Sequence, residues 1–163
     1  MNIIYFILFG LAKYTNSFVT NANIVIRTEL DIFNKIIDNN NLLCHSQSSR
    51  IKTFESSLQK LNKINSHNVY DLYDLIAFRY VFYNKDDLLK FYHHFKQEKE
   101  VWYIKNYIST PKINGYSAMH MRYKNTYEEC PIKQLECQLY VIKDYYESVY
   151  GNSKYHKNYT LYF

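Results

Sequence analysis

The sequence LIAFRYVFY, at residues 75–83, is short, almost entirely apolar or aromatic, and bounded by Asp74 and Asn84. A strand that is apolar on both faces is typical of the middle of a sheet, so this stretch predicts a central strand. Arg79 is the one charged residue inside it. Because an unpaired buried charge is costly, we expect Arg79 to reach the end of the sheet or to meet an anion.

Amphipathic helices are predicted on both sides of this strand. Apolar residues recur at helical spacing over residues 23–37, and a polar run follows them. Thr53 is expected to cap a second helix that runs to about residue 64. Asn84, with Asp87 three positions later, is expected to cap a third. The polar, Ser-rich residues 44–49 are interpreted as a connection.

Further strands are predicted in the second half of the chain, at residues 101–108, 119–124 and 133–140, and the last two should form a hairpin. A closing helix is expected over residues 141–150, with Gly151 ending it. The 163 residues suit one domain. We divide the chain into an apolar segment (1–20), the domain itself (21–151) and a basic, Tyr-rich tail (152–163).

Composition narrows the function only slightly. The formal net charge of +5 suits a site for phosphates as well as a nucleic-acid surface. Cys44, Cys130 and Cys137 fit no metal-ligand pattern, so we expect reduced thiols. A bridge between Cys130 and Cys137 is the alternative if the chain is secreted.

The apolar run at residues 3–12 is too short to span a membrane but long enough for the core of a signal peptide. Lys13 follows the run rather than preceding it, and no clear cleavage site is present. Two interpretations stay open, a cleaved signal or an element packed on the domain. We therefore expect no stable membrane span and a cytoplasmic protein, with secretion as the alternative.

Basic residues gather at the start of the second predicted helix, where Lys52, Ser56 and Lys60 follow each other at spacings of four and Arg50 stands just ahead. A helix N-terminus also favours anions, so this pattern resembles a phosphate cradle. A solvated basic face is the alternative.

The sequence TPKINGYSAMH, at residues 110–120, combines residue types that no core needs. Pro111 fixes φ and Gly115 permits positive φ, so the backbone can turn sharply and approach a ligand. Lys112 supplies a cation, Tyr116 a stacking face and His120 a donor or acceptor. An ordinary hairpin loop is the alternative.

Taken in order, these residues form four motifs: Arg50-x-Lys52-x-x-x-Ser56-x-x-x-Lys60; Tyr73-Asp74 followed by Arg79; Lys105-Asn106-Tyr107-Ile108 with Pro111-Lys112-x-Asn114-Gly115-Tyr116-x-x-x-His120; and Glu136-x-Gln138. Over residues 50–151 the chain resembles the synthetase domain of the RelA/SpoT alarmone family. The resemblance implies an α+β fold, a mixed and mainly antiparallel sheet of about five strands flanked by helices, like that of nucleotidyltransferases.

The resemblance also implies an activity, a GTP diphosphokinase-like transfer of the β,γ-pyrophosphate of ATP to the 3′-hydroxyl of GDP or GTP. Mg²⁺ is the expected cofactor. Asp74 and Glu136 would be the catalytic and metal-binding residues. The implied ATP-binding residues are Arg50, Lys52, Ser56, Lys60 and Arg79. The implied acceptor-binding residues are Lys105, Lys112, Asn114, Tyr116, His120 and Gln138, with Tyr116 stacking on the guanine.

Departures from the family pattern leave alternatives open. Asn106 replaces an Asp, and Tyr140 and Val141 replace the Arg-Thr that ends the family's Glu-x-Gln-Ile-Arg-Thr strand. One alternative is transfer of pyrophosphate to the 3′ end of tRNA, as in toxic small alarmone synthetases. The others are a degenerate synthetase that only binds nucleotides and a basic nucleic-acid-binding module. We expect no hydrolase or regulatory domain, as in small single-domain alarmone synthetases, which often form homo-oligomers.

Overall fold

Five strands form a single sheet in the computed structural model, which describes residues 16–151. The order across the sheet is β1-β2-β5-β4-β3. In chain order the elements are α2 (Asn16–Asn39), β1 (Cys44–Ile51), α3 (Phe54–Lys63), the short 3-10 helix η1 (Val69–Asp71), β2 (Ile76–Phe82), α4 (Lys85–Glu98), β3 (Val101–Asn106), β4 (Met119–Lys124), β5 (Gln134–Val141) and α5 (Ile142–Tyr150).

Strand β2 is the central strand that its apolar sequence predicts, and every one of its residues is buried. It runs antiparallel to β1 and parallel to β5, while β5–β4 and β4–β3 are antiparallel pairs. The mixed, mainly antiparallel sheet is therefore confirmed. The register places Ala77 beside Glu136 and Arg79 beside Gln138, which brings the polar residues of two strands together.

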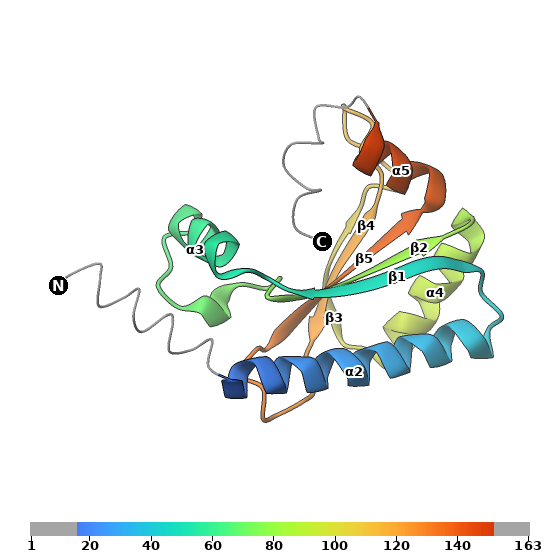
Figure 1. Cartoon of the computed structure of the whole chain (residues 1–163). Coiled ribbons are helices and arrows are strands. Elements are labelled where there is room, and N and C mark those ends of the chain that lie inside the picture. The colour runs from blue at the N-terminus through green and yellow to red at the C-terminus, as the bar shows by residue number, and fades with distance from the viewer. Residues whose placement is uncertain (1–15, 152–163) are drawn as a thin grey trace.

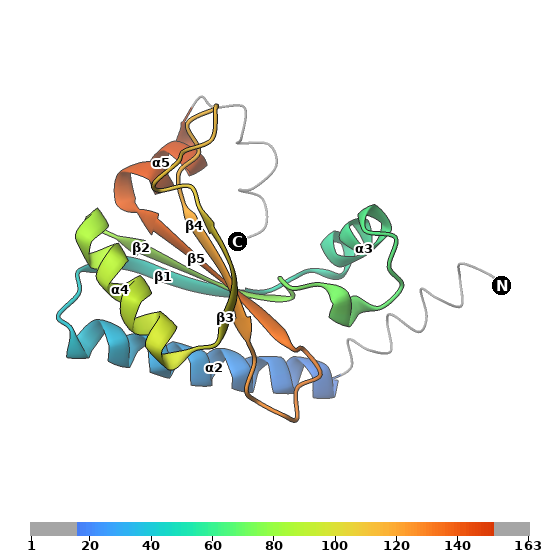
Figure 2. The same cartoon turned by 180° about the vertical axis from the view of Figure 1, so that it is seen from behind.

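One face of the sheet carries the hydrophobic core. Helices α2 and α4 lie together on this face in both views (Figures 1 and 2). Phe33 of α2 is fully buried, and its ring packs edge-on against Phe78 and Tyr80 of β2, each at a centroid distance of 5.3 Å. These contacts explain why alternate residues of β2 are aromatic.

Among the described residues, the opposite face carries only a smaller apolar cluster, made of Val81, Tyr116, Ala118 and Tyr140. Helix α3 lies beyond the end of β1, and α5 follows directly from β5 (Figure 1). Side chains that point to this face include Arg79, Glu136 and Gln138, whose neighbours along each strand point to the core. We call this side the open face.

The prediction of a connection at residues 44–49 was wrong, because Cys44–Ile51 forms strand β1. This strand lies at the edge of the sheet and its exposed positions are polar. It therefore lacks the apolar pattern that marks a strand in sequence, and its pairing with β2 holds it in place. Helix α2 also begins earlier than predicted, at Asn16.

Thr53 and Asn84 cap their helices as predicted. Cys44, Cys130 and Cys137 are free, as expected, so the alternative bridge is not formed. Within residues 16–151 no helix has the length and apolar character needed to cross a membrane. The apolar run at residues 3–12 and the tail at residues 152–163 lie outside the described residues.

Candidate functional site

Asp74 is the centre of the basic cluster at the start of α3. Its Oδ2 lies 3.1 Å from Nζ of Lys52 and 2.8 Å from Nζ of Lys60. Burial by itself raises the pKa of this carboxyl, but the ammonium groups of Lys60 and Lys52 outweigh it and lower the pKa. Burial lowers the pKa of Lys52, an effect that Asp74 opposes. The phosphate cradle thus contains a buried, ionised carboxylate.

Helix α3 carries two residues of this cradle. Thr53 Oγ1 accepts a hydrogen bond from the backbone N–H of Ser56 at 3.3 Å and donates to Ser56 Oγ at 3.0 Å. The cap fixes the first turn, so Lys60, one turn later, reaches Asp74. The alternative prediction, a solvated basic face, does not fit Lys52 and Lys60, because both side chains are largely buried.

Two arginines lie on the same side of the sheet. Arg50 of β1 is half-buried, and burial lowers its pKa while Asp74 and Glu136 raise it. Arg79 is 7% exposed, and its Cζ lies 5.4 Å from the ring centroid of Tyr140 and 5.3 Å from that of Tyr145. Part of the stabilisation of this buried cation therefore comes from aromatic faces.

A closed ring of hydrogen bonds joins five side chains of the predicted acceptor region. Glu136 Oε1 lies 3.4 Å from His120 Nδ1, and His120 Nε2 lies 2.7 Å from the Tyr116 hydroxyl. The Tyr116 and Tyr140 hydroxyls are 2.8 Å apart. Tyr140 donates to Gln138 Oε1 at 3.4 Å, and Gln138 Nε2 donates to Glu136 Oε2 at 3.1 Å, which closes the ring.

Glu136 is the acidic member of this ring and is 7% exposed. Burial raises its pKa, but the hydrogen bond and charge of His120, together with the Gln138 amide, outweigh burial and lower the pKa. Glu136 is therefore held as a carboxylate, with each oxygen oriented by one neighbour.

The loop that carries Tyr116 turns as its sequence predicts. Gly115 has a φ of +83°, and its N–H donates to the carbonyl of Lys112 at 2.7 Å. Asn114 Oδ1 accepts from the N–H of Tyr116 at 3.3 Å, so this side chain shapes the loop. Lys112 Nζ lies over the rings of Tyr107 and Tyr116, at 4.6 and 5.0 Å.

The structure thus brings most of the predicted site residues onto the open face, in two groups. The first surrounds Asp74, and the second is the hydrogen-bonded ring that contains Glu136. Lys105 lies further out, on the exposed edge strand β3. Tyr116 is only 6% exposed, so its ring is not presented for stacking in this arrangement.

Three residues of the site were not predicted as ligands from sequence. Tyr73 and Arg122 contact each other beside Lys60, and Tyr140 belongs to the ring. In sequence, Tyr140 is visible only as a departure from the family pattern. No sequence signal marks Tyr73 and Arg122 as a pair, because they lie on different elements.

Asn106 is a departure that the structure explains locally. Its Oδ1 accepts from the N–H groups of Ile108 and Ser109, both at 3.1 Å, and its Nδ2 donates to Ser109 Oγ at 3.0 Å. A neutral amide therefore closes the turn after β3, and an aspartate here would have to accept from the Ser109 hydroxyl instead of donating to it.

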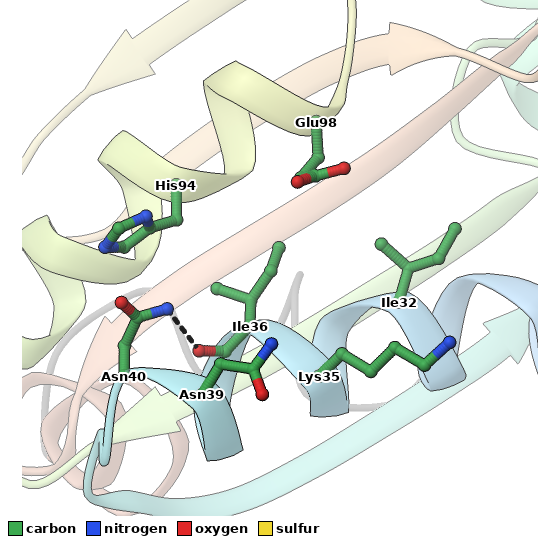
Figure 3. A pocket seen from close by; sticks show the side chains of 7 residues that line it. All are labelled: Ile32, Lys35, Ile36, Asn39, Asn40, His94 and Glu98. Carbon is green, nitrogen blue, oxygen red and sulfur yellow. Dashed lines mark hydrogen bonds between the residues drawn. The ribbon is translucent and has the colours of Figure 1, made fainter.

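Neither of two further cavities is lined by Asp74 or Glu136. One of about 420 Å³ lies between α2 and α4, on the core side of the sheet, and contains none of the predicted site residues (Figure 3). Its lining is Ile32, Lys35, Ile36, Asn39, Asn40, His94 and Glu98. The other, of about 580 Å³, adjoins the acceptor loop and is lined by Tyr107 and residues 110–114.

Asp74 offers an oxygen that suits a magnesium ion. Asp74 Oδ1 is buried and has no hydrogen-bond partner within residues 16–151, so a hard oxygen ligand is available there. Groups of three or more His, Cys, Asp or Glu that could hold a metal are absent from the same residues. One or two carboxylates are what Mg²⁺ ordinarily takes when substrate phosphates supply other ligands.

Residues 49–159 match the sequence family described as the region found in RelA/SpoT proteins. The chain belongs to the RelA/SpoT family. The resemblance drawn from the motifs is thereby confirmed. Among curated protein sequences, none matches this RelA/SpoT chain.

Solved structures share the fold of this RelA/SpoT protein. Small alarmone synthetase 2 from Bacillus subtilis is similar with a TM-score of 0.70 and 22% identity, over 82% of this chain and 75% of that one. Small alarmone synthetase 1 from Bacillus subtilis, bound to its product pppGpp, has a TM-score of 0.65 and 16% identity, over 80% and 74%. A GTP pyrophosphokinase family protein from Streptococcus pneumoniae has a TM-score of 0.65 and 16% identity, over 90% and 73%.

Proposed function

We propose that this RelA/SpoT protein transfers the β,γ-pyrophosphate of ATP to the 3′-hydroxyl of GDP or GTP. The observation that carries the proposal is the pair of buried carboxylates, Asp74 and Glu136, on a face that also holds the cradle lysines and two arginines. Such an excess of cations around acidic groups suits a polyphosphate.

Lys52, Lys60 and Ser56 would bind the phosphates of ATP. Both lysines already meet at Asp74, so their charges converge on one point. Arg50 and Arg79, whose guanidinium groups are planar, would contact the adenine. Mg²⁺ bound by Asp74 and Glu136 would neutralise charge that develops on the transferred phosphates.

Glu136 would receive the acceptor hydroxyl. As the 3′-oxygen bonds to the β-phosphorus and the bond from that phosphorus to the α–β bridging oxygen breaks, AMP leaves and the hydroxyl proton passes to Glu136. Its lowered pKa keeps the group ionised before the reaction. His120 and Gln138 orient the two oxygens for this role.

The acceptor loop supplies the second nucleotide site. Lys105 and Lys112 would bind the acceptor phosphates, and Asn114 would keep the loop in shape. Stacking of the guanine on Tyr116 requires the loop to expose the ring first, because only 6% of this residue is accessible.

Incubation with labelled ATP, Mg²⁺ and either GDP or GTP tests the proposal. We expect AMP together with a guanosine tetra- or pentaphosphate, and no product from the Asp74→Asn or Glu136→Gln variants. Parallel reactions with tRNA distinguish the other acceptor, since label would then enter RNA. Absence of AMP with every acceptor would contradict the proposed activity.

A further inference from the structure

Three cations and two tyrosines alternate across the open face. Lys60 Nζ lies 3.8 Å from the ring centroid of Tyr73, and Arg122 Cζ lies 3.1 Å from the same centroid. On its other side Arg122 Cζ is 4.3 Å from the centroid of Tyr103, over which Lys105 Nζ lies at 5.6 Å. We call these five residues, from Lys60 to Lys105, the cation–tyrosine row.

The row connects the two halves of the site. Lys60 belongs to the cradle around Asp74, and Lys105 lies on β3, which leads into the acceptor loop. Arg122 stands between them on β4, directly across from Glu136 in the register of β4 and β5. A phosphate chain that lies between Lys60 and Lys105 would therefore lie near this guanidinium.

Arg122 pairs with no carboxylate in the part of the chain that the structure describes. Within residues 16–151 its guanidinium makes no ion pair and no hydrogen bond, although Glu136 is its neighbour across the strands. Both oxygens of Glu136 are engaged elsewhere, one by His120 and one by Gln138. Among the described residues, the interactions recorded for this guanidinium are its contacts with the rings of Tyr73 and Tyr103.

Stacking on a ring leaves the N–H groups of a guanidinium available, because they lie in its plane and point sideways. Arg122 is half-buried and close to a second cation, Lys60, which shares the Tyr73 ring. Asp74 compensates the charge of Lys60, at 2.8 Å, but no carboxylate among residues 16–151 compensates that of Arg122. An anionic ligand would supply the missing countercharge.

We infer that Arg122 is a further phosphate-binding residue of this site, which contacts a polyphosphate lying between Lys60 and Lys105. The inference rests on the proposed function for the identity of the ligand as a nucleotide polyphosphate. The planar guanidinium can bind phosphate oxygens in pairs, which an ammonium group cannot.

Equilibrium binding of ATP and of inorganic tripolyphosphate to Arg122→Ala tests the inference without requiring catalysis. We expect the dissociation constant of both ligands to rise about tenfold or more, since a charge-assisted hydrogen bond is lost. Arg122→Lys should recover only part of the affinity. Lys124→Ala is the matched control, because Lys124 lies on the same strand, is exposed and pairs with Glu100 at 3.4 Å.

Tyr103→Ala provides a second variant that keeps every charge. Tyr103 is 38% exposed, so its removal should leave the fold intact while releasing one side of Arg122. We expect a severalfold weaker binding of tripolyphosphate. Unchanged affinity in Arg122→Ala, with folding confirmed by circular dichroism, would overturn the inference whatever the result for Tyr103→Ala.

The two proposals fail in different ways. If the protein makes product and Arg122→Ala has the wild-type KM and affinity, the role of Arg122 is wrong and the activity stands. If the wild type binds ATP through Arg122 but releases no AMP with any acceptor, the activity is wrong and the phosphate contact stands.

Discussion

Tyr140 replaces a family arginine, yet it is integrated into the site rather than merely tolerated. Its hydroxyl contacts the Tyr116 hydroxyl and donates to Gln138 Oε1, and its ring lies under Arg79. An arginine introduced here would stand against the buried Arg79 unless the surroundings rearranged. The contacts of Tyr140 with its neighbours therefore suit a tyrosine at this position.

Tyr140→Phe opens the hydrogen-bonded ring at two contacts. We expect a loss of about 1 kcal/mol in the free energy of unfolding, because Tyr116 and Gln138 each lose a buried partner. The acceptor KM should rise more than the KM for ATP. Denaturant titration and steady-state kinetics measure both, with Tyr83→Phe, at a residue 53% exposed, as the neutral control.

Asp74 contributes to stability as well as to the proposed chemistry. Because its pKa in the folded protein lies below the ordinary value of 3.8, its ionised form stabilises the fold fully above that pH. This stabilisation is lost as the pH falls through the folded-state pKa.

Asp74→Asn should therefore destabilise the protein most at neutral pH, by up to about 3 kcal/mol, since two lysines lose their shared carboxylate. The difference from wild type should shrink as the pH is lowered below 3.8. Thermal unfolding of both proteins across this range measures the effect. A difference that stays constant with pH would mean that the charge of Asp74 is not what stabilises the fold.

Helix α3 positions the cradle, so its cap should affect binding. Thr53→Ala removes the acceptor for the Ser56 N–H, and Asn84→Ala removes the acceptor for the Asp87 N–H on α4. Each should cost about 1 kcal/mol of stability. Only Thr53→Ala should weaken ATP binding in a titration, because α4 lies on the core face. Equal weakening of ATP binding by Thr53→Ala and Asn84→Ala would contradict a specific role of α3 in the site.

Helix α5 begins at a residue that cannot cap it. Val141 is in the N-cap position and makes no side-chain hydrogen bond to the helix. Val141→Thr restores the family residue and should raise the free energy of unfolding by about 1 kcal/mol, because a threonine oxygen can accept from a first-turn N–H. A stability unchanged or lowered in denaturant would show that the packing of Val141 outweighs the cap.

At the scale of the whole molecule, α2 precedes the region matched to the family, and a buried ion pair joins the two in addition to the aromatic contacts of Phe33. Glu29 Oε1 lies 2.7 Å from Nζ of Lys99, which follows α4, and the two side chains are 3% and 5% exposed. Glu29 Oε2 is buried and lacks a hydrogen-bond partner among the described residues. This pair crosses the core between distant parts of the chain.

Glu29→Leu or Lys99→Met alone should cost about 3–5 kcal/mol, because each leaves one buried charge without its partner. The double variant should be closer to wild type, since two apolar side chains need no compensation. A double-mutant cycle in denaturant measures the coupling. Additive losses would contradict a strong pairing of these charges.

The sequence alone determined the central strand, the capped helices and the family, because apolar periodicity and motif spacing are local properties of the chain. The spacing also grouped Lys52 with Lys60, and the resemblance to the family implied that Asp74 belongs to the same site. These predictions depend on neighbours along the chain, where residue type and spacing carry the information.

Tertiary structure decided the rest. Strand β1 has no apolar pattern and exists through its pairing with β2. The ring around Glu136 and the stacking of Arg122 on Tyr73 join residues from different elements. Long-range contacts of this kind depend on strand register and on which face each side chain takes, and a shift of one residue in register would separate them all.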